Sequence, residues 1–227
     1  MTRLFTLCPL LVVVATTTSL GAAELSFLDL RVGGGILSNE FKGSSSSSVT
    51  NNSTNVTTNT SNDDDARNAD NNYRGQIQLV YGNLGPAGGL IVGAGIAANQ
   101  ARFENGPYRT DVTTPVVDVL IGYGIAVTPG WHFELTPFAG AGRAYYSVHN
   151  DGDSSTEKDW SKYAEYGVKL GTYFTFAESL QVGLEIPYLV GRFNPEYNHD
   201  DGQNTTTITD TSRNQGFGLL LTVGGRF

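Results

Sequence analysis

Apolar residues recur at every second position in eight segments of roughly ten residues each. This is the period of a β-strand, whose successive side chains point to opposite faces, and not the period of a helix. In one segment, for example, Val182, Leu184 and Ile186 alternate with Gly183 and Glu185. The segments cover about 25–37, 73–83, 88–103, 113–127, 131–142, 163–176, 180–193 and 216–227. The pattern predicts an all-β chain of eight antiparallel strands.

The second face of these strands is mostly glycine, interspersed with single charges. Glycine accounts for 28 of the 227 residues, about 12 %, against a usual share of about 7 %. A soluble β-sandwich or lipocalin would also alternate, but its solvated face would be rich in Thr, Lys and Glu and would avoid glycine. Glycine with paired charges instead suits the narrow lumen of a closed membrane barrel. We therefore favour a membrane barrel, and a soluble lipocalin-like fold is the alternative.

The connections between the segments alternate strictly between long and short. Long polar connections span 38–72, 104–111, 150–162 and 194–213, and short ones span 84–87, 128–130 and 177–179. Transmembrane barrels have short turns on the periplasmic side and long loops outside. We therefore predict an eight-stranded antiparallel up-and-down transmembrane β-barrel in the cell outer membrane. Both termini would be periplasmic, and the long loops would be extracellular.

The N-terminus has the layout of a secretory signal peptide. An apolar run over 4–15 follows Arg3, and small residues occupy 21–23. The run is too short for a transmembrane helix, which needs about 20 residues. We expect cleavage after Ala23, with Ala22 as the alternative, which divides the chain into a signal peptide (1–23) and a barrel (24–227). The single cysteine, Cys8, lies in this leader, so no disulfide is expected in the barrel.

The first long connection, 38–72, is a low-complexity segment with five consecutive serines and three consecutive aspartates. Such a stretch buries too little apolar area to offset its ordering entropy, so we expect a mobile surface loop. The chain as a whole has a formal net charge of −8. This excludes nucleic acid as a partner, because phosphate binding needs a basic surface.

The C-terminal "GFGLLLTVGGRF", ending at Phe227, resembles the outer-membrane sorting signature. "LTPFAGAGRAYY" at 135–146 and "YGVKLGTYFTFAESLQVGLEI" at 166–186 are similar to strands of the small outer-membrane β-barrel family of the OmpA/OmpX type. The resemblance implies the fold, an outer-membrane location, and recognition of Phe227 by the barrel-assembly machinery. It implies no activity, and we expect no peptidoglycan-binding domain.

The polar face predicts a network of charges inside the barrel. An eight-stranded barrel is just wide enough to be filled by side chains, and unpaired charges there are costly. We expect salt bridges rather than a gated ion path. The residues expected in this lumenal network are Asp29, Arg31, Arg74, Asp118, Glu134, Glu165, Lys169 and Glu185.

Aromatic residues near the ends of the segments predict girdles that anchor the barrel at the two membrane interfaces. The residues expected there are Tyr73, Tyr123, Trp131, Phe133 and Tyr188, together with Phe227.

Candidate chemistry is sparse. Ser147, His149 and Asp151 form one Ser/His/Asp cluster, but at the start of a loop and without a recognisable hydrolase motif. We expect no catalytic residue, cofactor or metal site. The sequence favours a non-enzymatic protein with a structural or surface-interaction role, whose partners are outer-membrane lipid and an unidentified extracellular ligand. A small or gated passive, porin-like channel is the alternative, and an outer-leaflet lipid-modifying enzyme is third.

Overall fold

The computed structural model describes residues 25–54, 56–63, 67–85, 87–105, 108–150, 153–176, 179–194, 196–200 and 204–227. The predicted signal peptide lies outside these residues. The strands are β1 (Leu25–Asn51), β2 (Val56–Asp63), β3 (Arg67–Asn68), β4 (Asn71–Gly85), β5 (Gly88–Asn105), β6 (Tyr108–Thr128), β7 (Trp131–Asn150), β8 (Asp153–Phe176), β9 (Leu180–Asn194), β10 (Glu196–Asp200) and β11 (Asn204–Arg226). The described residues contain no helix long and apolar enough to cross a membrane.

Eight of these strands close into a ring, which confirms the predicted barrel. Each pairs antiparallel with the next in the order β1, β4, β5, β6, β7, β8, β9 and β11. The ring is completed where β11 pairs with β1, from Asp29 opposite Arg226 to Asn51 opposite Asn204. Every backbone group inside the ring is thus available to a neighbouring strand, so no edge is left open.

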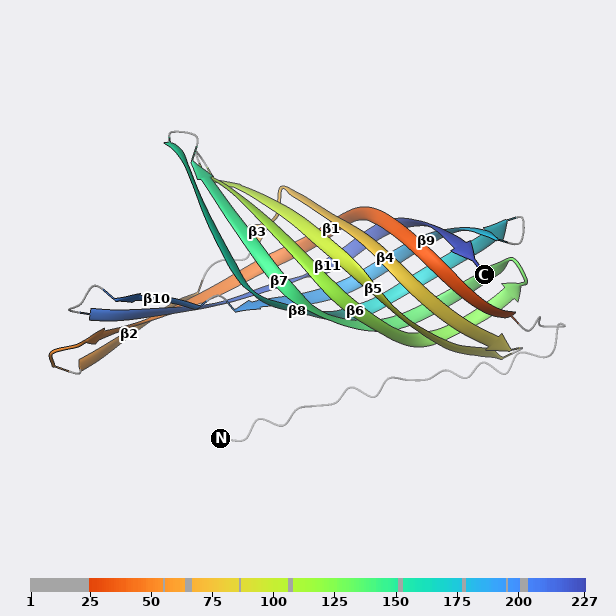
Figure 1. Ribbon diagram of the computed structural model, residues 1–227, viewed down its shortest axis with the longest axis horizontal. Helices are drawn as coiled ribbons and strands as arrows, with labels where there is room; N and C mark the ends of the chain where they lie inside the picture. The colour runs from red at the N-terminus through yellow and green to blue at the C-terminus, as the bar shows by residue number, and fades with distance from the viewer. Residues whose placement is uncertain are drawn as a thin grey trace.

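The two ends of the barrel differ (Figure 1). Short turns join β4 to β5, β6 to β7 and β8 to β9 at the end where the C-terminus lies, while β2 and β10 project from the opposite end. At the turn between β4 and β5, Gly88 has φ = 94°, a left-handed conformation that a residue with a side chain rarely adopts. The predicted long connections at 104–111 and 150–162 are corrected, because β5 ends at Asn105 with β6 beginning at Tyr108, and β7 ends at Asn150 with β8 beginning at Asp153. The two ends of the barrel differ because paired strands extend further at the hairpin end, not because the loops there are long.

The segment expected to be a loop at 38–72 is largely β-structure, which corrects the predicted strand boundaries. β1 runs on to Asn51, β2 folds back along it, and β11 starts as early as Asn204. The entropy argument counted only apolar burial, whereas here the adjoining strands satisfy each other's backbone groups well beyond the apolar part of the barrel. Ser and Thr also pair across the strands, as Thr50 and Thr57 do through hydroxyls 3.0 Å apart.

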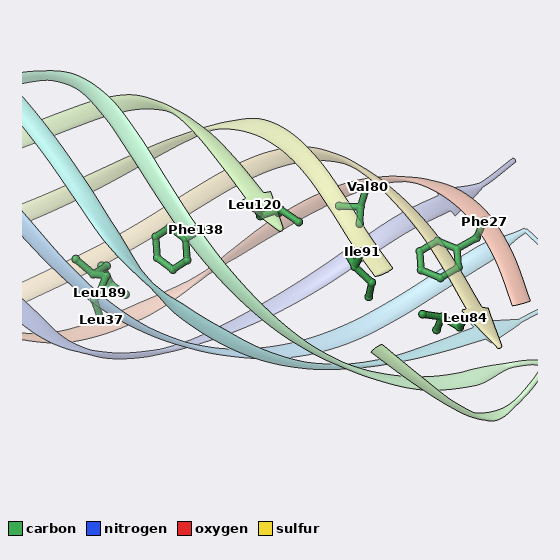
Figure 2. Close-up of a cluster of buried hydrophobic side chains, with 8 residues drawn as sticks. All are labelled: Phe27, Leu37, Val80, Leu84, Ile91, Leu120, Phe138 and Leu189. Atoms are coloured by element: carbon green, nitrogen blue, oxygen red, sulfur yellow. The ribbon is translucent and has the colours of Figure 1, made fainter. Parts of the chain in front are cut away.

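Inside the barrel, apolar side chains fill the space around the charged residues (Figure 2). One cluster comprises Phe27, Leu37, Val80, Leu84, Ile91, Leu120, Phe138 and Leu189. A second comprises Ala97, Ala101, Val112, Val116, Ala144, Tyr163 and Phe193. The sequence pattern predicted glycine and charge on the lumenal face and missed these residues, although β6 alone contributes Val112, Val116 and Leu120.

Candidate functional site

Arg31 lies at the centre of the half of the lumen that is nearer the short turns. We call this the lower half, and the half nearer the projecting hairpins is the upper half. The Arg31 guanidinium donates to both carboxylate oxygens of Glu134, at 2.8 and 2.7 Å, and to Asp29 at 3.0 Å. Its Nε donates to Gln181 Oε1 at 3.0 Å, and Gln181 donates in turn to Asp29 at 2.7 Å. These groups come from β1, β7 and β9, and all are buried. The arrangement is a bidentate, charge-assisted pair that ties distant walls of the barrel together.

Two further charged or titratable residues join this cluster, and the sequence analysis did not include them. Arg226 donates to Asp29 through Nε at 2.9 Å and through Nη2 at 3.1 Å. His132 Nε2 lies 2.9 Å from Glu134 Oε1. Both residues fall at inward-facing positions of the alternating pattern on their strands. The alternation alone could therefore have identified them.

Tyr173 connects the lower cluster to the upper half of the lumen. The guanidinium of Arg31 lies 3.9 Å from the centre of its ring, a cation–π contact. The Tyr173 hydroxyl donates to Glu185 Oε1 at 2.8 Å. The ring lies against Gly171 and Gly183, where any Cβ would overlap it. Glycine on the lumenal face is therefore the space in which this ring fits.

Glu185 and Lys169 continue the network. Lys169 Nζ lies 3.0 Å from Glu185 and donates to Gln78 at 2.7 Å. Gln76 donates to the same carboxylate at 2.7 Å. Gln76 and Gln78, both on β4, thus bond to charged groups from other strands.

Arg74 organises the upper part of the network. It lies 2.8 Å from Glu165 and 3.4 Å from Asp118. Its Nη1 donates to Asn99 at 2.9 Å, while the Asn99 amide and the Tyr163 hydroxyl each donate to Glu165 at 3.0 Å. The structure thus places all eight predicted lumenal residues inside the barrel, in two hydrogen-bonded clusters that the cation–π contact between Arg31 and Tyr173 connects.

The network leaves little free space. A cavity of about 10 Å³ remains among Arg74, Gln76, Gln78, Asp118, Phe138, Lys169 and Pro187. That volume is about the size of one water molecule's accessible space. With Arg226, four bases face the five carboxylates, and His132 stands beside one of them. What the arrangement does chemically is fill the lumen and place a base beside every carboxylate.

The outward face of the same strands is apolar and exposed. Leu221 is 66 % exposed and Val117 is 63 % exposed, while their strand neighbours Leu220 and Val116 are 0 % and 4 % exposed. Similar side chains point outward from all eight strands of the ring. An apolar belt of this kind around a closed sheet with a polar interior is suited to hydrocarbon and not to water. The chain is a transmembrane β-barrel of the outer-membrane type.

The predicted girdle residues lie near the two ends of this belt. Trp131 stacks on Phe174 at 5.3 Å and contacts Phe133 at 5.2 Å near the short turns, where Tyr123 and Phe227 are also exposed. Towards the other end Tyr188 contacts Phe217 at 4.8 Å, and Tyr73 is exposed. Their anchoring role remains a prediction.

The Ser/His/Asp cluster is only partly described. Ser147 and His149 lie two positions apart on β7, and Asp151 lies outside the described residues. Within the part of the chain that the structure describes, no group of three or more His, Cys, Asp or Glu side chains could hold a metal ion.

Comparisons with known proteins give distant likenesses in structure alone. No family model matches the chain. No curated protein matches it either. The solved structure of Ail, the attachment invasion locus protein of Yersinia pestis, in complex with the heparin analogue sucrose octasulfate, is 15 % identical, with a TM-score of 0.37, over 85 % of this chain and 99 % of that one.

Two other solved structures show the range of proteins involved. The outer membrane protein OprG from Pseudomonas aeruginosa is 14 % identical, with a TM-score of 0.39, over 88 % of this chain and 95 % of that one. The outer membrane protease OmpT from Escherichia coli is 11 % identical, with a TM-score of 0.32, over 93 % of this chain and 99 % of that one. The fold assignment rests on the strand register and the apolar outer face.

Proposed function

We propose that this chain is a non-enzymatic outer-membrane barrel that is closed to flux and carries long hairpins on the cell surface. The observation that carries the proposal is the set of buried charge pairs that joins facing walls across the lumen, with a cavity of about 10 Å³ among Arg74, Asp118 and Lys169. Breaking a buried pair is strongly unfavourable, so transport through this path would require rearranging the network.

The projecting hairpins supply the second half of the proposal. β1 with β2, and β10 with β11, extend beyond the apolar belt in Ser-, Thr- and Asn-rich sequence. This composition is suited to water and to polar contacts. The proposed orientation puts these hairpins outside the cell and the short turns in the periplasm, as is usual for bacterial barrels.

Planar-bilayer recording tests the closed lumen. The full-length protein, refolded and shown to be closed by a heat-dependent gel shift, is expected to give no conductance steps at either voltage polarity. Reproducible steps in protein that has passed the gel-shift control would overturn the proposal.

A gated channel is the second candidate because the upper lumen has unsatisfied polar atoms. Asn39 and Asn72 are buried, and neither amide has a hydrogen-bond partner. Such groups favour water at this level. Conductance that appears only above a threshold voltage would support this candidate and contradict a permanently closed barrel.

Epitope tags test orientation and display. A tag between Asn52 and Ser53, in the β1–β2 turn, is expected to bind antibody on intact cells. A tag at Gly130, in a short turn, is expected to bind antibody only after permeabilisation.

A deletion tests the role of the hairpin. In cells lacking the protein, expression of a chain without residues 48–59 should show whether detergent resistance needs the hairpin. Full rescue by this chain favours a structural role, and loss of rescue favours surface contact.

A further inference from the structure

The outer wall of the barrel carries a belt of basic side chains at the hairpin end. We call this the basic belt, and its members are Lys42, Arg102, Arg109, Arg143, Lys162, Arg192 and Arg213. Among the side chains that the structure describes, every outward-facing Lys or Arg lies in this belt. The chain as a whole has a net charge of −8, so the belt does not follow from composition.

The register sets several of these like charges side by side. Arg213 lies opposite Arg192 on one neighbouring strand and opposite Lys42 on the other. Arg143 lies opposite Lys162 in the same way. Like charges directly opposite each other destabilise an antiparallel pair. A row of three bases on adjacent strands therefore calls for a negative group beside Arg192 and Arg213, which have no acidic partner among the described residues.

The belt divides into a neutralised part and a free part. Arg102 and Arg109 both bind Asp111, each at 2.9 Å. In the row, Lys42 lies 3.6 Å from Glu40. No ion pair joins Arg192, Arg213 or Lys162 to an acidic side chain among the residues that the structure describes.

These three bases without an acidic partner among the described residues all lie at the same distance, along their strands, from an outward-facing aromatic residue. Arg213, Arg192 and Lys162 each lie four positions beyond an outward-facing aromatic residue on the same strand, Phe217, Tyr188 and Tyr166 respectively. The order from barrel centre to hairpins is therefore apolar, aromatic, basic. In a membrane these zones correspond to hydrocarbon, interface and headgroup phosphates.

We propose that Arg192 and Arg213, flanked by Lys42 and Lys162, bind a phosphate group of an outer-leaflet lipid. The planar guanidinium groups match phosphate oxygens in bidentate geometry, and the shared anion removes the repulsion within the row. A lipid fits better than a free anion or a soluble sulfated glycan, because the row borders the aromatic zone directly and the acyl chains would lie on the apolar belt below it.

The proposal rests on the outer-membrane barrel and on the proposed orientation with the hairpins outside the cell, but not on the absence of enzymatic activity or of conductance. Channel activity would overturn the proposed closed lumen and leave the lipid site untouched. Conversely, loss of the lipid site would leave the charge network in the lumen unaffected, since the site and the network share no residue.

Lipid titration of the folded barrel tests the site. The full-length protein in micelles of an uncharged maltoside detergent is titrated with lipid A, and native mass spectrometry measures the bound fraction. The double variant R192Q/R213Q is expected to bind about 25-fold more weakly, because each basic side chain near an anionic lipid surface contributes about fivefold. The matched control R102Q/R109Q removes the same charge from the part of the belt already neutralised by Asp111, so it should bind nearly as the wild type does.

Three probes decide between the sources of the anion. Dephosphorylated lipid A should bind as weakly to the wild type as lipid A does to R192Q/R213Q. Inorganic phosphate and heparin, each added as competitor, should displace lipid A only weakly. Equal loss in the two double variants, equal binding of dephosphorylated lipid, or efficient displacement by phosphate or heparin would each overturn the assignment. All proteins must first show the heat-dependent gel shift of a closed barrel.

Discussion

The inner and outer faces of the same strands handle charge in opposite ways. Inside, Arg31 and Arg74 have carboxylates within hydrogen-bond distance from other strands. Outside, Arg213 faces Arg192 and Lys42, which carry the same sign. The difference teaches that the bases in the lumen find their counter-charges within the chain, whereas Arg192 and Arg213 on the outer wall depend on anionic groups in the surroundings. Substitutions on the two faces should therefore differ in size and in their dependence on lipid.

The largest effect is expected at the centre of the lumen. Arg31→Met leaves Glu134 buried without its arginine and Asp29 with Arg226 alone, which should cost about 3–5 kcal/mol of unfolding free energy. Urea unfolding in lipid vesicles, followed by tryptophan fluorescence, measures it. The control Arg213→Met removes the same group from the exposed wall and should cost much less. Equal losses would contradict the division between the two faces.

A charge placed on the apolar belt should have the next largest effect. Leu221 points outward with 66 % of its surface exposed, and Leu221→Arg would put a guanidinium into hydrocarbon at about 2–4 kcal/mol. Leu221→Ala is the control, since it removes contact without adding charge. Unfolding in vesicles is again the measurement. If Leu221→Arg proved neutral, the belt would not face lipid.

A substitution at a glycine that faces the lumen should lower the unfolding free energy by a smaller amount. A Cβ at Gly183 would overlap the Tyr173 ring, whereas a Cβ at Gly75, on the outer face, would meet nothing within 4 Å. Gly183→Ala is therefore expected to cost about 1–3 kcal/mol through overpacking. Gly75→Ala should leave the unfolding midpoint nearly unchanged, and a comparable loss in both would show that glycine acts through the strand backbone instead.

The smallest effect concerns acid titration at the hairpin end. Burial raises the pKa of Asp111, but hydrogen bonds from Arg102 and Arg109 outweigh it and hold the pKa below its usual value. A lowered folded pKa means that the stabilisation is present above the unfolded pKa and is lost as pH falls through the folded one. Protease cleavage of the β5–β6 hairpin should rise only in strong acid, below about pH 4. Asp111→Asn should be cleaved equally at all pH values.

Much of the barrel could be predicted because alternation assigns a side chain to a face without reference to any other strand. Asp29, Arg31 and Glu134 were placed in the lumen in this way. Their pairing could not be predicted: Arg31 and Glu134 are 103 positions apart, and their contact depends on how the strands stagger around the ring. Arg226 also has the polar-face parity of its strand, but it was left out of the predicted charge network.

The strand ends were harder to predict than the strand centres. Beyond Leu37 the apolar alternation stops, yet β1 continues to Asn51 because β2 and β11 lie beside it. Backbone pairing of this kind leaves little trace in hydrophobicity. The basic belt was overlooked for a related reason, since its members are scattered along the chain and only the register brings Lys42, Arg192 and Arg213 into a row.

The pairing of β1 with β11 has a consequence for biogenesis. The first and last of the eight strands are hydrogen-bonded from Asp29 opposite Arg226 to Asn51 opposite Asn204, so the ring has two open edges until β11 has been synthesised. Open edges invite pairing with other chains. The nascent protein must therefore be kept apart from its copies as an unclosed sheet, and insertion into the membrane can be completed only after translation.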